Sequence, residues 1–463
     1  MISQSLQMGQ LYLGVLAKSG WSGMWIFWVN VLGSFVVPLV FAPLWHALQL
    51  ETDNQFYLIR YPGKWGQFLH IFRVGYVGIG ISALLVSFNV LAFARLVAYF
   101  YQINPHMALL LSGGLLLGYI LINPGQHKTF WTRSMLALVL GFCLTIFYVL
   151  YHMANNHPAE NVTARDLFPT TSLQWNMFWS YLGILWWSTE LFDGGGKETS
   201  RFTANSSGIN TIKAALVPVI GQTIVSMLIM LLCWYLLQQG QRGLITEADF
   251  VPLLLNQVPA FGQWMIVLGF AAMFLSSALA QLNWGASLMM IDGLKIYGRN
   301  TFDRINNRPM EVGLIVFLGM LSLMIAWRAD DLMTLAQWMF SISAGVAPFY
   351  ILRWFWWRVS ALSQWLVMVC SALSTLTFDT WITWTPILHG LDLPHDEKRM
   401  VAVTCITLIM GIFASFIFKS DRPQQTFIDV VLPIRSKIKY LLMAFGFGVL
   451  FLFLKLGLLV LIL

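Results

Sequence analysis

The sequence has 463 residues, of which 58% are hydrophobic and 10% are charged, whereas a soluble domain carries about 25% charged residues. Aromatic residues make up 15%. This composition excludes a disordered chain, a nucleic-acid-binding protein and an ordinary soluble enzyme. A membrane-spanning helix needs about 20 mostly apolar residues, so the chain can supply roughly a dozen spans. We therefore predict an all-α polytopic membrane protein.

Hydrophobic periodicity predicts thirteen spans. They run approximately over 2–18, 24–48, 72–101, 107–122, 132–153, 175–192, 212–237, 261–291, 312–327, 332–352, 361–383, 400–418 and 440–463. The four cysteines lie inside these apolar runs, so we expect buried thiols and neither a disulfide framework nor a zinc site. We see no cleavable signal peptide in Met1–Gly20 and expect no cofactor.

Charge bias between alternate loops predicts the orientation. Of 27 Lys and Arg residues, two lie inside spans (Arg95 and Lys455) and six lie in one set of loops (Lys18, Arg165, Arg242, Arg328, Lys398 and Arg399), which leaves nineteen for the other set. The set that is rich in basic residues should face the cytoplasm. We therefore expect a multi-pass protein of the plasma (inner) membrane with its amino terminus inside and its carboxyl terminus outside.

Two spans near the amino terminus carry polar residues that a bilayer would penalise. The first has Gln4, Gln7 and Gln10 spaced about one turn apart, which either line a cavity or pack inside the bundle. The third has Arg95, which we expect to extend to the outer surface. The external loop Gln238–Gly262 is either a lid or a simple connector.

The sixth and eighth spans carry further polar groups. The sixth passes from Trp186 through Glu190 into Gly194–Gly196, which predicts a broken helix beside a cavity, with a glycine-capped helix end as the alternative. On the eighth, Ser276, Ala280, Asn283 and Ser287 share one face. This face either packs closely against another helix or supplies oxygen ligands to a small hard cation.

At these motifs the sequence resembles the sodium:solute symporter family, in particular a bacterial branch of unknown substrate. The similarity is collinear and includes Thr52–Tyr61 with Gly63-Lys64, the Gly194–Gly196 run, Ala280–Ser287 and Tyr350–Arg358. It implies a leucine-transporter-like core of two inverted five-helix repeats in residues 1–352, followed by accessory helices in 353–463. In this fold, substrate and ion sites lie where the first helix of each repeat is broken.

The resemblance also implies site residues. Ser276 and Ser277 match the paired hydroxyls of the family's common sodium site, where the Met273 carbonyl and first-span carbonyls near Ser5 and Met8 would join them. Trp186 takes the place of the inner-gate aromatic. The substrate and gate residues would be Gln7, Gln10, Trp186, Trp187, Glu190 and Ser343.

Two departures from the family bear on coupling. The usual helix before the first core span is absent, so we expect a first span that is partly missing or a chain truncated at its amino terminus. Some members of the family carry an aromatic-Thr-Asp run whose carboxylate supports a second sodium. The corresponding run here is Trp131-Thr132-Arg133, and its positive charge disfavours a cation, so we expect at most one sodium.

We therefore expect cation-coupled secondary active transport of a small organic solute by alternating access, with Na+ as the coupling ion. The alternative is a relative with the same fold that is a proton-coupled carrier, an uncoupled carrier or a transport-dead sensor. In the proton-coupled case Glu190 would be the proton site. A membrane enzyme would need a paired catalytic His or carboxylate. The histidines lie in loops or at span ends, and we predict no such pair.

The predicted topology can be tested by cysteine labelling. A cysteine beside Arg304 should react with an impermeant reagent only after the cells are permeabilised, because basic loops stay in the cytoplasm. A cysteine beside Asp166 should react in intact cells. The reverse pattern would contradict both the orientation and the assignment of the repeats.

Overall fold

A computed structural model shows only helices, turns and loops in the residues that it describes. These residues are 5–122, 140, 143–151, 163, 165–188, 192–238, 244–295, 307–329, 331–385, 390–420, 422–435 and 438–462. For this part of the chain the predicted all-α class is confirmed.

The helices fall into three groups along the chain. The first group is α1 (Ser5–Gly23), α2 (Trp25–Trp28), α3 (Asn30–Ser34), η2 (Val37–Phe41), α4 (Ala42–Leu48), η3 (Asp53–Gln55), α5 (Phe56–Arg60), α6 (Lys64–Arg73), η4 (Val74–Ile81), α7 (Ser82–Tyr101) and α8 (Pro105–Ile122). The second is α10 (Ser172–Ile184), η5 (Gly196–Glu198), α11 (Thr199–Thr203), α12 (Gly208–Gln238), η6 (Glu247–Asp249), α13 (Phe250–Leu255), α14 (Ala260–Ser287), η7 (Leu288–Lys295), α16 (Asn307–Arg328) and α17 (Leu332–Phe355). The third is α18 (Ala361–Leu376), α19 (Phe378–Trp381), η8 (Ile382–Trp384), α21 (His395–Ile417), α22 (Gln425–Arg435) and α23 (Ile438–Ile462).

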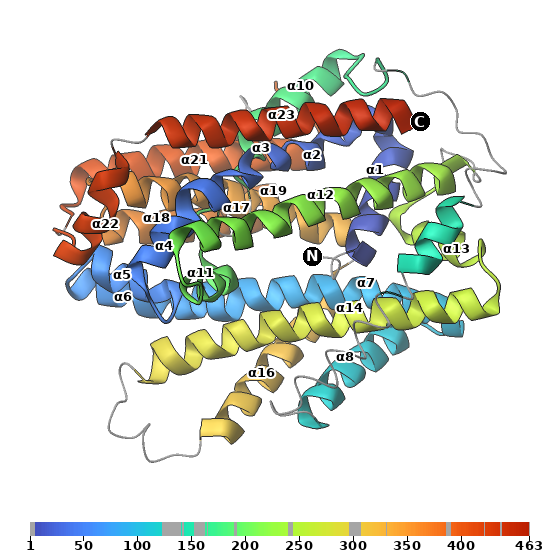
Figure 1. The fold of residues 1–463 in the computed structure, drawn as a ribbon, viewed down its shortest axis with the longest axis horizontal. Coiled ribbons are helices and arrows are strands. Elements are labelled where there is room, and N and C mark those ends of the chain that lie inside the picture. Colours follow the sequence, from blue (N-terminus) through green and yellow to red (C-terminus); the bar gives the residue numbers. More distant parts are fainter. Residues whose placement is uncertain are drawn as a thin grey trace.

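Most long helices run side by side along the long axis of the molecule, while α8 and α16 cross it obliquely (Figure 1). Among the described residues, eight helices are long and apolar enough to cross a membrane. A ninth candidate is the pair Ala361–Leu376 and Phe378–Trp384, which bends by 72°. The chain is thus a multi-pass membrane protein.

Packing within the bundle centres on α7, which contacts α14, α16 and α8, whereas α1 packs mainly against α12. In the last third of the chain, α21 packs against α17 and α18, and α23 packs against α3. A Cβ on Gly448 of α23 would lie 2.4 Å from the Leu32 carbonyl oxygen, so only glycine permits this close approach. The division at residue 352 stays a prediction.

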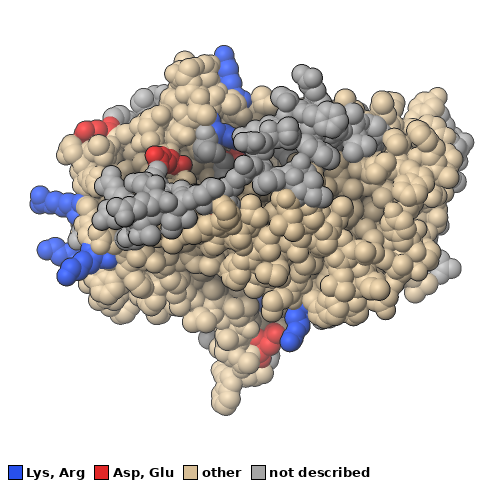
Figure 2. Space-filling model, turned by 90° about the horizontal axis from the view of Figure 1, so that it is seen from below, with Lys and Arg blue, Asp and Glu red and all other residues tan. Residues whose placement is uncertain are grey.

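Lys and Arg side chains project from several edges of the visible face. Figure 2 shows some of them at its left-hand end, where α5 and α6 lie in Figure 1, and others at its upper and lower edges. The sides of the bundle expose apolar residues, among them Ile409 and Phe413 of α21 and Leu450 of α23. The left-hand end is the one that the charge bias predicts to be cytoplasmic.

Three expectations about the spans are changed by the structure. The predicted span 175–192 is helical only to Ile184, and the chain turns before it reaches the glycines. Cys143 and Cys405 are exposed and Cys370 is partly exposed, because an apolar run also covers the outer, lipid-facing sides of helices; Cys233 is buried as predicted. The predicted span 132–153 lies largely outside the described residues.

Candidate functional site

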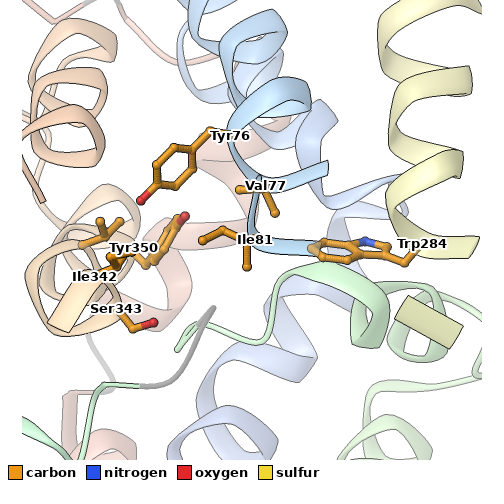
Figure 3. Close-up of a pocket in the computed structure, with 8 residues that line it drawn as sticks. Tyr76, Val77, Ile81, Trp284, Ile342, Ser343 and Tyr350 are labelled. Atoms are coloured by element: carbon orange, nitrogen blue, oxygen red, sulfur yellow. The ribbon is translucent and has the colours of Figure 1, made fainter. Parts of the chain in front are cut away.

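A small cavity, partly open to solvent, lies between η4, α14 and α17. It is lined by Tyr76, Val77, Ile81, Trp284, Ile342, Ser343, Val346 and Tyr350 (Figure 3). The lining holds aromatic rings, aliphatic side chains and hydroxyl groups but no charged side chain. The Tyr76 hydroxyl is buried without a hydrogen-bond partner among the described residues. Such a lining suits an uncharged group of a small solute.

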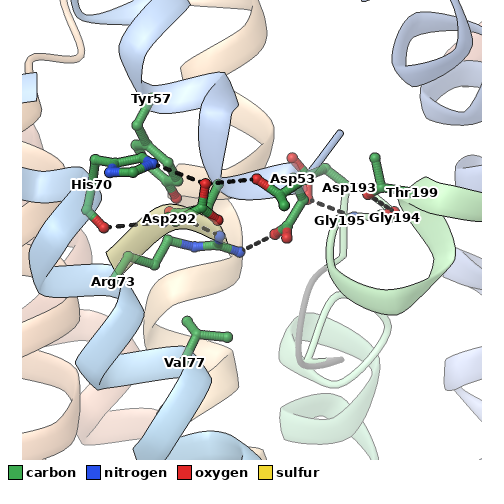
Figure 4. A network of polar contacts seen from close by, with 12 residues as sticks. Asp53, Tyr57, His70, Arg73, Val77, Asp193, Gly194, Gly195, Thr199 and Asp292 are labelled. Carbon is green, nitrogen blue, oxygen red and sulfur yellow. Dashed lines mark hydrogen bonds and ion pairs between the residues drawn. The ribbon is translucent and has the colours of Figure 1, made fainter. Parts of the chain in front are cut away.

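Next to this cavity lies a buried cluster that we call the ion network: Asp53, His70, Arg73, Asp193, Asp292 and Arg353, of which Figure 4 labels the first five. None of these side chains is more than 1% exposed. Tyr350 joins the cavity to the network, because the Arg353 guanidinium lies 4.6 Å from the centre of its ring.

The first ion pair of the network joins Arg353, at the end of α17, to Asp193. The Arg353 Nε and Nη2 atoms donate to Asp193 Oδ2 over 3.1 and 2.5 Å. The indole N–H of Trp354 donates to the same oxygen over 2.7 Å, and that of Trp45 donates to the Asp193 carbonyl over 2.7 Å. Arg353 Nη1 also donates to the Tyr57 hydroxyl. A buried carboxylate is stable only with such partners.

The glycine run explains how Asp193 reaches this position. Gly194 and Gly196 have φ values of 74° and 81°, which other residues rarely adopt. A Cβ on Gly195 would lie 3.4 Å from Asp53 Oδ2, so this backbone passes close to the second carboxylate of the network. The helix of the sixth span ends at Ile184, before the glycines rather than at them, and the segment that follows it forms an ion pair with α17.

The second ion pair joins Arg73, at the end of α6, to Asp53 in η3. Arg73 Nη1 also donates to Asn54 Oδ1 over 3.2 Å, and Asn54 Nδ2 donates to the His70 carbonyl over 3.0 Å. The Asp53 Oδ1 atom is buried without a partner among the described residues. This pair ties the segment after α4 to the third span.

Asp292, in the π-helical turn that ends the eighth span, supplies the third carboxylate. Its Oδ1 atom accepts from the Thr52 hydroxyl over 2.9 Å and lies 3.3 Å from His70 Nε2. The prediction that no histidine is paired is therefore wrong. Sequence position alone suggested that His70 lies at a span end, but α6 and η7 fold together and bury it.

The opposite end of the bundle is closed by Arg95 and Glu247. Arg95 Nη1 lies 2.5 Å from Glu247 Oε1, and the Glu247 carboxylate also accepts from the backbone N–H groups of Leu332 and Met333 over 2.9 and 3.2 Å. Glu247 packs on α1, 3.1 Å from the position of a Cβ on Gly14. Arg95 is thus held by an ion pair. The loop Gln238–Gly262, predicted to be a lid or a connector, packs on α1.

The predicted ion-site residues of α14 have free oxygens. Ser276 is exposed, Ser277 is half-buried and Met273 is buried. Neither serine hydroxyl hydrogen-bonds to another described residue, although many helical hydroxyls here, such as that of Ser322, donate to the carbonyl four residues earlier. Among the described residues, no group of His, Cys, Asp or Glu is arranged to hold a metal ion.

The first-span residues are placed in regular helix. From Ser5 onward α1 stays helical until Gly20, so the expected break does not fall at Ser5 or Met8. The Met8 sulfur accepts from Gln222 of α12 over 3.2 Å. Because α1 packs mainly against α12, the structure does not assemble these first-span atoms with Ser277 into one site.

The predicted glutamine contacts face the third span. Gln7 Nε2 donates to Asn89 Oδ1 over 2.5 Å, and Gln10 Nε2 donates to the Ala92 carbonyl over 3.1 Å. Both Oε1 atoms are buried without a partner among the described residues. These side chains therefore pack between α1 and α7, the packing alternative, and each keeps one acceptor for a donor.

The predicted gate residues are divided between two places. Trp186 packs edge-to-face against Trp187, Phe192 and Phe445, with ring centres 4.9 to 5.6 Å apart, so it is packed toward α23. Ser343 lines the cavity. Glu190 lies outside the described residues.

No family model and no curated protein matches this sequence. Among solved structures, a Na+-coupled sialic acid symporter in a substrate-bound outward-open state matches with a TM-score of 0.57 and 15% identity, over 91% of this chain and 90% of that one. A nucleobase-cation-symport-1 family transporter, closed with bromovinylhydantoin bound, matches with a TM-score of 0.43 and 12% identity, over 90% and 92% of the two chains. The first likeness confirms the predicted leucine-transporter-like fold.

The ion pair between Arg353 and Asp193 should dominate the stability of this end. Asp193→Asn leaves a buried guanidinium without its counter-charge, which should cost about 3–5 kcal/mol. Thermal unfolding of the purified protein in detergent should show a melting temperature several degrees lower. The control is Glu198→Gln, which breaks the ion pair with Arg201. Arg201 is 66% and Glu198 34% exposed, so this variant should lower the free energy of unfolding by less than about 1 kcal/mol. Equal shifts in both variants would contradict the account.

Proposed function

We propose that this chain is a cation-coupled secondary active transporter of a small organic solute, that it belongs to the sodium:solute symporter family, and that Na+ is the coupling ion. The proposal rests on one observation above all: two separate ionic closures lie on the same two helical spans, with the cavity between them. On the third span, Arg73 and Arg95 flank the cavity residues Tyr76 to Ile81. On α17, the cavity residues Ile342 to Tyr350 lie between the start of the helix, where Glu247 accepts from the Leu332 N–H group, and Arg353 near its end.

This arrangement suits alternating access. A carrier must close one end of its binding site before the other opens, whereas a channel needs no second closure. Each closure here joins segments that are distant in the sequence, so opening one end requires separating whole elements. The fold, shared with a Na+-coupled symporter, supports the same function.

Ser276 and Ser277 are the candidate ligands of the coupling ion. Their hydroxyls are free, and a hydroxyl that does not donate to its own helix can ligate a hard cation. The missing partners would be first-span carbonyls, which must approach α14 when the ion binds. A cation shifts the equilibrium between two states only if it binds one of them more tightly.

The alternative functions keep the fold and change the coupling. A proton-coupled carrier, a facilitator or a sensor that does not transport would show no dependence on sodium at a fixed membrane potential. A screen of small solutes for thermal stabilisation of the purified protein, with and without sodium, identifies the substrate and tests the coupling together.

Ser277 gives the sharpest test of sodium coupling. Ser277→Ala removes one ligand but keeps the small volume that helix packing needs, so it should raise the sodium concentration for half-maximal uptake several-fold without reducing expression. Ser277→Cys, a poor ligand for a hard cation, should act in the same direction. The matched control is Ser322→Ala, because that hydroxyl is already bonded within its helix. Unchanged sodium dependence in both Ser277 variants would remove the ion from this site.

A further inference from the structure

The ion network holds one carboxylate more than it holds paired guanidinium groups. Arg353 pairs with Asp193 and Arg73 pairs with Asp53, so among the described residues Asp292 is left without a guanidinium. The neighbouring Arg60 does not supply one, because its Nε and Nη2 atoms donate to the backbone carbonyls of Arg353, Trp356 and Val359, and its Nη1 atom has no partner among the described residues.

The surroundings of Asp292 do not tolerate a lone negative charge. Its side chain is fully buried, and its Oδ2 atom has no partner among the described residues. The Thr52 hydroxyl donates one hydrogen bond, but it carries no charge. A buried carboxylate without a counter-charge is unfavourable, and the usual remedy is to bind a proton.

We propose that His70 and Asp292 form a proton-binding site whose occupancy is linked to closure of this end of the carrier. His70 Nε2 lies 3.3 Å from Asp292 Oδ1, so one proton shared by the pair neutralises the extra charge as an imidazolium–carboxylate pair. The ligand is the proton itself, and the site is distinct from the cation site at Ser276 and Ser277.

The link to closure follows from the elements that meet at the pair. His70 lies on α6, Asp292 on η7 and Thr52 just before η3, so the pair separates when these elements move apart. Water then solvates the carboxylate, and the extra proton is no longer required. Because the closed state binds more protons, acid pH stabilises closure and a rise in pH favours opening.

Other charged and titratable groups surround the pair, namely Asp53 of η3, Tyr57 of α5, Arg73 of α6, Tyr76 of η4, Asp193 and, on α17, Tyr350 and Arg353. Asp53 and Asp193 each face an arginine that keeps its charge, and tyrosine and arginine do not normally change charge near neutral pH. Histidine is the one side chain here whose ordinary titration range lies near neutrality.

The test is a labelling experiment that needs neither solute nor sodium. Val77, which is buried, lines the cavity and lies near Arg73 (Figure 4), is replaced by cysteine in a background that carries Cys143→Ser, Cys370→Ser and Cys405→Ser. An impermeant maleimide is applied to the face predicted to be cytoplasmic between about pH 6 and 8, where histidine titrates. Each rate is divided by that of exposed Lys64→Cys, which removes the pH dependence of thiol reactivity.

The ratio should rise with pH, by up to about tenfold per unit for one linked proton. Asp292→Asn, which needs no proton, should give a ratio that does not rise with pH. His70→Gln leaves Asp292 to bind the proton alone, so this variant should keep a slope. His46→Gln is the matched control, because His46 lies at the same end but is half-buried and bonded to the Phe202 carbonyl, and it should keep the wild-type slope.

Three outcomes would overturn the proposal: no slope in the parent, an unchanged slope in Asp292→Asn, or loss of the slope in His46→Gln. Should His70→Gln not fold, as judged by gel filtration, Asp292→Asn decides alone. The proposal rests on the proposed function only in assuming that this end opens. Uptake that does not depend on sodium, together with the predicted pH dependence of labelling, would contradict sodium coupling while supporting the proton site at His70 and Asp292.

Discussion

A carboxylate and a guanidinium buried away from water depend on each other, and the contact between Asp193 and Arg353 imposes this constraint on the whole structure. Asp193 reaches the contact only because the sixth span stops and the following glycines adopt left-handed backbone angles. Arg353 reaches it from the end of α17, which also lines the cavity. The break in one span, the end of another and the base of the cavity are therefore held together by one interaction.

The two closures differ in their access to water, and this gives them different strengths. Arg95 and Glu247 are 19% and 13% exposed, so solvent weakens their attraction. Arg353 and Asp193 are both fully buried, and separating them exposes two charges that must be hydrated again. Opening at the Glu247 end should thus require less free energy than opening at the ion network. For the transporter proposed above, we infer a resting state in which the network end is closed until an ion or a solute shifts the balance.

The sequence predicted the fold well because long apolar runs and loop charges report directly on a bilayer. It predicted the ion network poorly. Arg60, Arg73 and Arg353 were counted as basic loop residues, yet all three are buried, since a charge count does not show which loops fold back onto the bundle. The signal was present, because the stretches that resemble the symporter family supply Asp53, Arg353 and the glycine run. Ser343 lines the cavity, and its predicted role in binding stays a prediction. Gln7 and Gln10 face α7, because a polar stripe shows a shared face but not the helix opposite.

The central claim is that the Asp193–Arg353 pair keeps the network end closed. Gln67 of α6 and Ala204, just after α11, are both exposed and can carry spin labels. Pulsed electron paramagnetic resonance between the two labels would report the distance across this end. The double variant Asp193→Asn with Arg353→Gln removes both charges together and leaves no lone buried ion. The account predicts one narrow distance distribution for the parent protein and a second, longer distance in the double variant. An identical single distribution in both proteins would contradict it.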